Sequence, residues 1–226
     1  MDVKRICEMK LNTHITQLFA GGIGVLEQEG HRSGIFKRRI TGRVEVNALG
    51  IVGDEHADPR VHGGAEKALH QYCADNYAAL KAAFPGAAND LVLGAIGENI
   101  SASTLSEKNV HIGDTFRIGT VLAQVSQPRS PCWKINHRFS APEMSTFVAN
   151  HHITGWYYRV LEAGHLEEGD EITLMERQTE RFSIDEFWRV QLSHRPDVAD
   201  LEAIADIPGL CPEWRQRLLG RAARLA

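Results

Sequence analysis

Cys132 is the residue of this chain best suited to metal binding or nucleophilic chemistry. It ends the segment 126–132, SQPRSPC, in which two prolines flank Arg129 and Ser130. Each proline has a fixed φ and disfavours helix at the residue before it, so the loop should be stiff. A nearby cation such as Arg129 favours the thiolate, which is the nucleophilic and metal-binding form of cysteine. The alternative is a buried structural thiol, because free cysteine is among the most buried residue types.

Two other segments could bind an anion. Gly63 and Gly64 precede residues 69–84, whose apolar members recur at helical spacing, so the pattern predicts a helix that begins at these glycines. Free N–H groups and the helix dipole would favour an anion there. Residues 31–44 contain no acidic residue but a cluster of lysine and arginine. They form either a solvated basic edge strand or the wall of a pocket for a small anion such as phosphate.

Three further polar residues could serve a site. His62 could be a ligand or a proton donor, or a turn residue that hydrogen-bonds locally. Glu98 and Asn99 lie in a short run of apolar and polar residues, where they could cap a loop or face a pocket. The residue types alone leave these alternatives open.

Short strands joined by glycine-containing turns must position these residues. Val121, Ala123 and Val125 alternate as one face of a strand that leads into the Cys132 loop, and residues 110–118 form a hairpin with it through Gly119. Further strands are expected at 44–52, 156–161 and 171–175, and a helix is expected after the proline of the segment 140–142. This pattern is typical of an all-β barrel or sandwich.

The composition changes near Arg177. Residues 183–186, SIDE, form a capping box that starts a helix, and two more short helices should begin at Asp197 and Pro212. Three helices in about 45 residues bury too little core to be stable alone, so they should pack on the β domain or on a partner. We therefore divide the chain into a β domain, 1–176, and a three-helix domain, 177–226.

The bulk composition narrows the functional class. The chain has 226 residues, of which 43% are hydrophobic and 24% charged, as in an ordinary globular protein. Its net charge of −4 argues against a dedicated nucleic-acid binder. No apolar run reaches the roughly 18 residues of a membrane span and no signal peptide is recognisable, so we expect a cytoplasmic protein without a membrane partner.

The cysteines fit no disulfide framework and no cysteine-bound metal cluster. Cys7, Cys73, Cys132 and Cys211 lie far apart and form no C-x-x-C pair, which excludes a zinc ribbon and an iron–sulfur cluster. Cys73 falls on the apolar stripe of the predicted helix and should be a core residue.

The order and spacing of several motifs resemble those of the MOSC domain, the fold found at the C-terminus of molybdenum cofactor sulfurase. The motifs are 53–56 (GDEH), 61–64 (VHGG) with Lys67 and Ala68, 97–99 (GEN), 126–132 (SQPRSPC) and 155–160 (GWYYRV). The resemblance covers nearly the whole chain and extends to a stand-alone bacterial subgroup that carries a three-helix tail. The chain departs from the family at Ala65, where relatives often have proline.

This resemblance implies a mainly β (α+β) fold, in which a closed barrel similar to that of pyruvate kinase carries a few helices and the three-helix tail. It also implies a molybdenum–pterin cofactor, with Cys132 as the protein ligand to molybdenum. Relatives reduce N-hydroxylated compounds, including base analogues such as 6-hydroxylaminopurine, to amines, which is a detoxification reaction. Cys132 would then be the catalytic metal ligand, and the reaction would need proton donors, for which His62 and Glu98 are the candidates. From charge and order along the chain we expect the cofactor to be bound by Lys37, Arg38, Gly63, Gly64, Lys67, Asn99 and Arg129.

Such a reduction consumes two electrons per turnover, and the sequence contains no cysteine cluster and no flavin or nicotinamide motif. We therefore expect that a separate reductase, a flavoprotein, donates the electrons. The protein itself is expected to be a monomer or a homodimer. Two other functions remain open. Cys132 could be a persulfide carrier or a nucleophile with His62 as its base, or the protein could carry the molybdenum cofactor without turnover.

Overall fold

The computed structural model of the protein describes residues 11–26, 30–58 and 62–225. Cys7, and Val61 of the second motif, lie outside the described residues. None of the helices in the described ranges combines the length and the apolar character needed to span a bilayer.

The described chain consists of short strands followed by helices. The strands are β1 (Asn12–His14), β2 (Gln17–Ala20), β3 (Gly24–Leu26), β4 (His31–Ser33), β5 (Arg38–Ile40), β6 (Val44–Asn47), β7 (Gly50–Ile51), β8 (Leu69–Cys73), β9 (Ile100–Ala102), β10 (Thr115–Ile118), β11 (Val121–Pro128), β12 (Trp156–Glu162), β13 (Gly164–Leu166) and β14 (Glu171–Glu176). The helices are η1 (Ala65–Lys67), α2 (Asn76–Ala83), η2 (Pro85–Ala87), α3 (Lys134–Arg138), α4 (Met144–Asn150), α5 (Ile184–Leu192), α6 (Val198–Ala205) and α7 (Pro212–Leu225).

Nine strands form one curled sheet in the order β1-β14-β10-β11-β12-β8-β9-β2-β5. The segment that contains β1 and β2 connects β14 near one end of this order with β9 near the other, because β1 pairs with β14 and β2 pairs with β9. Between them, the Ile15 N–H donates to the Asp170 carbonyl and the Thr16 N–H donates to the Ser101 carbonyl, both at 2.9 Å. This segment therefore closes the sheet into a barrel, and the predicted fold class is confirmed.

The β10–β11 hairpin forms, with β10 beginning at Thr115 and not at the predicted residue 110, and β12 forms as predicted, because the apolar residues of these strands alternate toward the barrel interior. Val121, Ala123 and Val125 are fully buried in the same core as Trp156 and Tyr158. β11 continues to Pro128, beyond the predicted end at Val125, because its last residues pair with the start of β12. The Cys132 loop consequently begins directly at the end of a long central strand.

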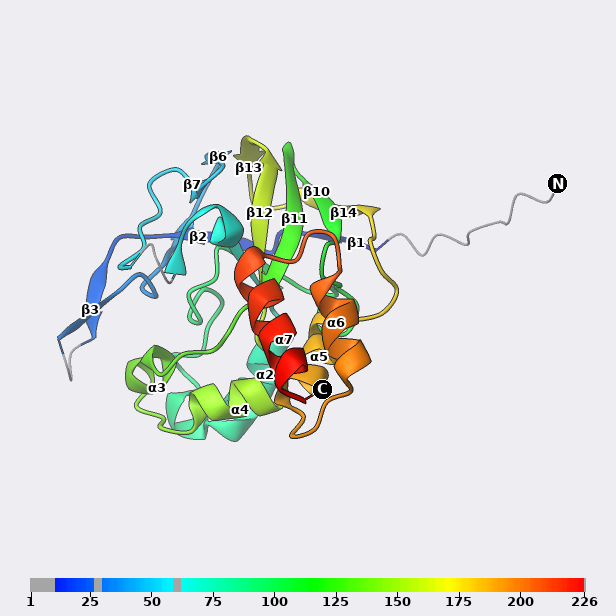
Figure 1. The fold of residues 1–226 in the computed structure, drawn as a ribbon. Coiled ribbons are helices and arrows are strands. Elements are labelled where there is room, and N and C mark those ends of the chain that lie inside the picture. Colours follow the sequence, from blue (N-terminus) through cyan, green and yellow to red (C-terminus); the bar gives the residue numbers. More distant parts are fainter. Residues whose placement is uncertain (1–10, 27–29, 59–61, 226) are drawn as a thin grey trace.

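The C-terminal helices pack on the barrel, as Figure 1 shows for α5, α6 and α7 beside β10 and β11. Phe187, Trp188 and Trp214 belong to the same hydrophobic core as the barrel interior. The predicted capping box is confirmed, since the Ser183 hydroxyl and the Glu186 carboxylate each accept the backbone N–H of the other residue. One core joins both parts of the chain, and the division at residue 177 stays a prediction.

A second core lies between the outer face of β8 and the helices α2, α3 and α4, which Figure 1 shows below the barrel. The predicted helix at Gly63 and Gly64 is wrong. These glycines precede the single 3₁₀ turn η1, then the strand β8, and the helix α2 begins only at Asn76. Every residue of β8 is buried, because one face meets the barrel core and the other meets the second core. A strand that is buried on both faces does not alternate polar and apolar residues. The usual strand signal was therefore missing, and the apolar residues of the segment 69–84 were assigned to a helix because their spacing fits a helical period.

Candidate functional site

A cavity with about 640 Å³ of empty volume, partly open to solvent, lies on the outer side of the barrel beside β8 and β12. Its described lining residues are Ser33, Gly34, Ile35, Lys37, His56, Ala57, His62, His70, Ile96, Gly97, Asn99, Arg129, Ser130, Cys132, Lys134 and Tyr157. In the described part of the chain the lining includes lysine, arginine and histidine but no carboxylate. The cavity therefore suits an anionic or neutral ligand better than a cation.

Five of the predicted site residues line this one cavity: Cys132, His62, Lys37, Asn99 and Arg129. They come from loops and strand ends that are far apart in the sequence. Cys132 is half-buried, whereas the other described cysteines, Cys73 and Cys211, are buried. Cys73 is thus a core residue as predicted, although it lies on a strand. Cys132 is the described thiol that a ligand could reach.

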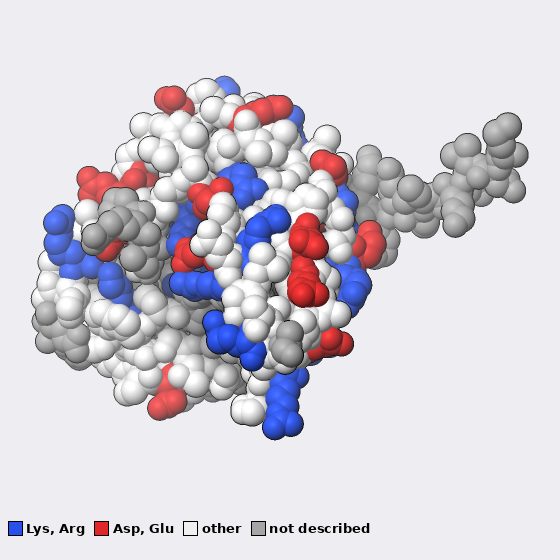
Figure 2. Space-filling model, viewed as in Figure 1, with Lys and Arg blue, Asp and Glu red and all other residues white. Residues whose placement is uncertain are grey.

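Four predicted cofactor-binding residues do not line the cavity. Arg38 lies exposed on β5 at the end of the sheet, and Gly63 and Gly64 lie before η1. Lys67 lies with its Nζ 3.8 Å from the Glu213 carboxylate on α7. Figure 2 shows basic and acidic side chains mixed on this face of the molecule around α7.

Glu98 is fully buried and does not line the cavity either. Its Oε1 accepts hydrogen bonds from the Tyr77 hydroxyl at 2.7 Å, the Gly94 N–H at 2.7 Å and the Ser101 hydroxyl at 2.8 Å. The carboxylate thus holds the loop between α2 and β9 together from behind. Gly97 and Asn99, its two neighbours in the sequence, face the cavity instead.

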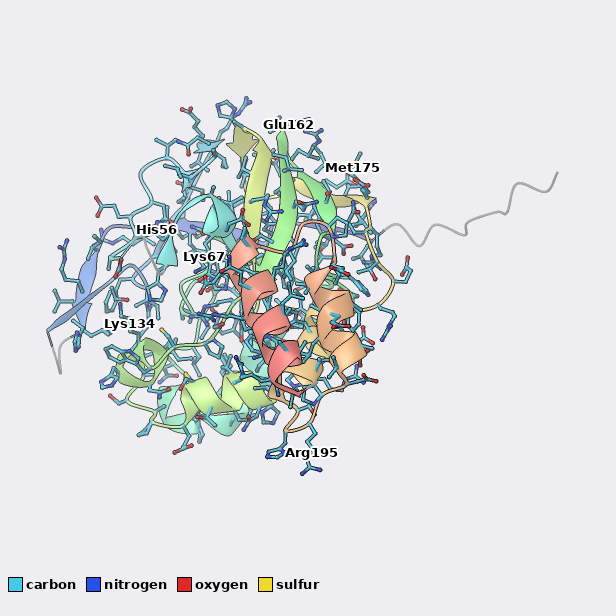
Figure 3. All side chains as sticks on the ribbon, viewed as in Figure 1. His56, Lys67, Lys134, Glu162, Met175 and Arg195 are labelled. Atoms are coloured by element: carbon cyan, nitrogen blue, oxygen red, sulfur yellow. The ribbon has the colours of Figure 1, made fainter. Side chains whose placement is uncertain are left out.

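Several lining residues carried no predicted role, namely Ser130, Lys134, His56, His70 and Tyr157. His56 and Tyr157 belong to motifs of the family resemblance, and His70 follows the second of these motifs. The alternation of β12 offered a signal for Tyr157, because it stands between the inward-facing Trp156 and Tyr158. Figure 3 shows His56 and Lys134 on the side of the molecule between β3 and α7, away from Glu162, Met175 and Arg195.

The Cys132 loop is fixed at both of its ends. The Arg129 N–H donates to the Gly155 carbonyl at 3.1 Å, which ties the loop to the start of β12. The Cys132 carbonyl accepts the Ile135 N–H at 3.2 Å and so begins the turn into α3. Lys134 Nζ donates to the Arg32 carbonyl at 3.0 Å, which attaches α3 to the β3–β4 hairpin. Backbone contacts on both sides therefore set the position of the thiol.

Arg129 provides an unused donor in the cavity wall. Its side chain is buried, and Nη2 donates to the Ile96 carbonyl at 3.4 Å. Nη1 is buried and has no hydrogen-bond partner among the residues that the structure describes. A buried donor without a partner is unfavourable by about 1–3 kcal/mol, and more when it is charged. An anion bound in the cavity would satisfy it.

Lys37, in contrast, already has a counter-charge. Its ammonium lies 2.6 and 2.5 Å from the two carboxylate oxygens of Asp54. Asp54 also accepts the Gly21 N–H and the Asn99 side-chain amide, each at 2.9 Å. Burial lowers the pKa of Lys37 more than Asp54 raises it. This network orders one end of the cavity, and it leaves Lys37 a weaker anion ligand than Arg129.

The three histidines of the cavity are neutral at pH 7. Burial lowers the pKa of His62 to about 4, and the positive charges of Lys134 and Arg129 contribute to this shift. Burial, with Arg129, lowers the pKa of His70 well below its usual value. Burial, with Lys37, also lowers the pKa of His56. The imidazoles can therefore donate or accept hydrogen bonds without adding positive charge.

The donor set fits a metal that brings most of its own ligands. The described residues include no group of three or more His, Cys, Asp or Glu side chains that could hold a metal ion. Cys132 offers a single soft thiolate, which suits a metal with sulfur-rich ligation. Together with the Arg129 Nη1, which has no partner among the described residues, and a described lining without carboxylates, it fits an anionic, metal-containing cofactor.

Comparisons with known proteins identify a family that the chain matches. Residues 58–173 match the family model of the MOSC domain. The chain is 40% identical to Protein YiiM of Escherichia coli K12 over 149 residues, which cover 66% of each chain, slightly under two thirds. It is 32% identical over 213 residues to the uncharacterized protein YflK of Bacillus subtilis 168, covering 93% of this chain and 95% of that one.

A third relative is a longer protein from Gibberella moniliformis that is called a reductase. The two are 40% identical over 159 residues, which cover 70% of this chain and 28% of the relative. The crystal structure of YiiM from E. coli superimposes with a TM-score of 0.79 at 26% identity, over 94% of this chain and 93% of that one.

Proposed function

This chain belongs to the MOSC domain family, and from this premise we propose that it is an oxidoreductase that reduces N-hydroxylated compounds to amines. The reaction would take place at the Cys132 cavity with a molybdenum–pterin cofactor. The observation that carries the proposal is the half-buried Cys132 thiol in a cavity whose described walls bear cations and imidazoles but no carboxylate. The reductase name of the G. moniliformis relative supports the reaction class.

The chain's own residues would bind and orient the cofactor. Cys132 would be the thiolate ligand to molybdenum, and the unpaired Nη1 of Arg129 would bind an anionic oxygen of the pterin phosphate. Lys134 lies in the same wall, and its ammonium has N–H donors beyond the one that binds the Arg32 carbonyl. Asn99 would help to order this wall, because its amide already donates to the Phe19 carbonyl and to Asp54. Once bound, this group would supply the two-electron redox chemistry that the side chains lack.

The overall reaction converts R–NHOH, two electrons and two protons into R–NH₂ and water, with cleavage of the N–O bond. We propose that a separate flavoprotein reductase supplies the electrons, as the missing flavin and nicotinamide motifs suggest. His62 would relay protons as a neutral imidazole, with one ring nitrogen accepting a proton from solvent while the other donates its own, because its pKa of about 4 leaves it unprotonated at pH 7. Glu98 would support the loop that carries Asn99, since its Oε1 accepts three hydrogen bonds behind the cavity wall.

The first test is the molybdenum and pterin content of protein made in a cofactor-competent host. Wild type should contain stoichiometric metal, Cys132→Ser should lose it, and the buried Cys211→Ala should keep it. The loaded wild type should then reduce an N-hydroxylated purine when a chemical reductant replaces the partner. Folded wild type without metal, or loaded wild type without turnover, would contradict the proposal.

One observation favours a second candidate, a thiol enzyme or persulfide carrier. Cys132 and His62 line the same cavity, and His62 has an unprotonated ring nitrogen at pH 7 that can accept the thiol proton, although its pKa of about 4 makes it a weak base. Metal-free wild type would then react with a thiol-directed alkylating agent at Cys132, and His62→Gln would slow this reaction at pH 7. Equal rates in both proteins would exclude His62 as a base.

A further inference from the structure

Tyr157 is an aromatic residue of the cavity wall whose role the proposed function leaves open. Its neighbours on β12, Trp156 and Tyr158, are fully buried in the barrel core. Successive side chains of a strand point to opposite faces, so Tyr157 projects away from that core and lines the cavity that contains Cys132. Its phenol is therefore available to a ligand in this cavity.

The surrounding strands fix the position of the Tyr157 ring. Tyr157 pairs with His70 on β8 and with Gln127 on β11, so it lies in the middle of three hydrogen-bonded strands. The Tyr157 and His70 ring centroids are 5.2 Å apart, with an angle of 42° between the ring planes. A side chain on a strand that is packed in this way can hold a hydrogen-bonding atom in a defined place.

The phenol keeps its proton at neutral pH. Burial raises the pKa of Tyr157, and the positive charge of Arg129 opposes this shift only in part. A guanidinium can only donate hydrogen bonds, so toward Arg129 the phenol oxygen of Tyr157 acts as the acceptor. The O–H proton remains available for a ligand beside Cys132.

We propose that the Tyr157 hydroxyl donates a hydrogen bond to the hydroxyl oxygen of the N-hydroxylated substrate, and thereby distinguishes the substrate from its amine product. This inference rests on the proposed function. A site that is built to hydrogen-bond a substrate hydroxyl discriminates strongly against the analogue that lacks it, because its own polar group is then left unpaired. The same contact favours release of the amine once the N–O bond has been cleaved.

The test compares the binding of 6-hydroxylaminopurine and adenine to the oxidised, cofactor-loaded protein without an electron donor. Wild type should bind the hydroxylamine more tightly than the amine, and Tyr157→Phe should lose about tenfold of this preference, as expected for one hydrogen bond. Molybdenum content should be unchanged. In turnover, kcat/KM of Tyr157→Phe should fall by at least the same factor. A purely structural role would weaken the binding of both ligands equally.

Tyr158→Phe is the matched control, because this neighbouring phenol donates to Gln71 Oε1 at 2.9 Å in the barrel core. It should keep the wild-type preference even if its melting temperature falls. The inference is overturned if wild type shows no preference, or if Tyr157→Phe retains it at full molybdenum content. Loaded wild type that binds both purines but does not reduce the hydroxylamine would overturn the proposed function instead.

Discussion

Both carboxylate oxygens of Asp54 contact the ammonium of Lys37, at 2.6 and 2.5 Å, and both side chains are almost completely buried. Asp54 also binds the backbone at Gly21 and the side chain of Asn99. A single acidic residue therefore connects three segments at one end of the cavity. Asp54 also neutralises the ammonium of Lys37, which the sequence analysis predicted to bind the anionic cofactor.

This pair predicts a large loss of stability for Asp54→Asn. Removing one partner of a buried ion pair leaves an uncompensated charge, which destabilises by about 3–5 kcal/mol. Chemical denaturation should measure this loss. The control is Glu162→Gln, which removes the exposed Arg117–Glu162 pair with a 2.8 Å contact and should change stability by less than about 1 kcal/mol. Equal effects of the two substitutions would contradict the prediction.

Arg129→Gln should lower the molybdenum–pterin content of protein from a cofactor-competent host, because it removes the donor that lacks a partner in the cavity. Lys67→Ala should leave the content close to that of wild type, since Lys67 lies outside the lining and beside Glu213. Metal analysis and pterin fluorescence of the purified variants measure both effects. If Lys67→Ala lowered the cofactor content and Arg129→Gln did not, the phosphate would bind near Lys67 and not in the Arg129 cavity.

Glu98→Gln separates support of the loop from proton donation. Glutamine keeps one oxygen that can accept the bonds from Tyr77, Gly94 and Ser101. We expect kcat within about fivefold of wild type, whereas loss of a general acid lowers the rate by about 10²–10⁴-fold. Glu98→Ala removes all three hydrogen bonds and should lower the melting temperature. A hundredfold loss in Glu98→Gln at full cofactor content would restore Glu98 as a proton donor.

His62 should make stability depend on pH between about 6.5 and 4. Its pKa is lowered from 6.5 to about 4 in the folded chain, so the unfolded chain binds more protons in this range. The stabilisation is therefore present above pH 6.5 and is lost as the pH falls through 4. His62→Gln should lose less free energy of unfolding than wild type between pH 7 and pH 4.5. A His62→Gln variant that loses as much stability over this range as wild type would contradict the prediction.

The C-terminal helices should be required for folding of the barrel. Trp188 lies in the shared core and donates its indole N–H to the Thr154 hydroxyl at 2.9 Å. Trp188→Ala should destabilise the chain by about 3–5 kcal/mol, and the fragment 1–182 should not unfold cooperatively. Trp133→Ala, at a 41% exposed position, should have a much smaller effect on stability. A fragment with a sharp thermal transition would show that 1–182 folds independently.

Features that depend on neighbouring residues could be predicted from the sequence. The capping box at Ser183 and Glu186, the β10–β11 hairpin and the strand that leads into the Cys132 loop form as expected, because their hydrogen bonds and alternation are local. The closed barrel was also predicted, but from the resemblance of the motifs to those of a known family and not from local pattern. The proline-flanked loop also indicated Cys132, but it left a buried structural thiol as the alternative, which the half-buried position of Cys132 in the structure excludes.

Features that depend on burial from two sides or on distant partners required the tertiary structure. β8 matched a helical period because the barrel core covers one of its faces and the second core covers the other. The counter-charge of Lys37, the buried position of Glu98 and the meeting of His70 and Tyr157 each involve segments that lie far apart along the chain. The residue types therefore determined which groups could act, and long-range packing decided which of them share the cavity and in what charge state.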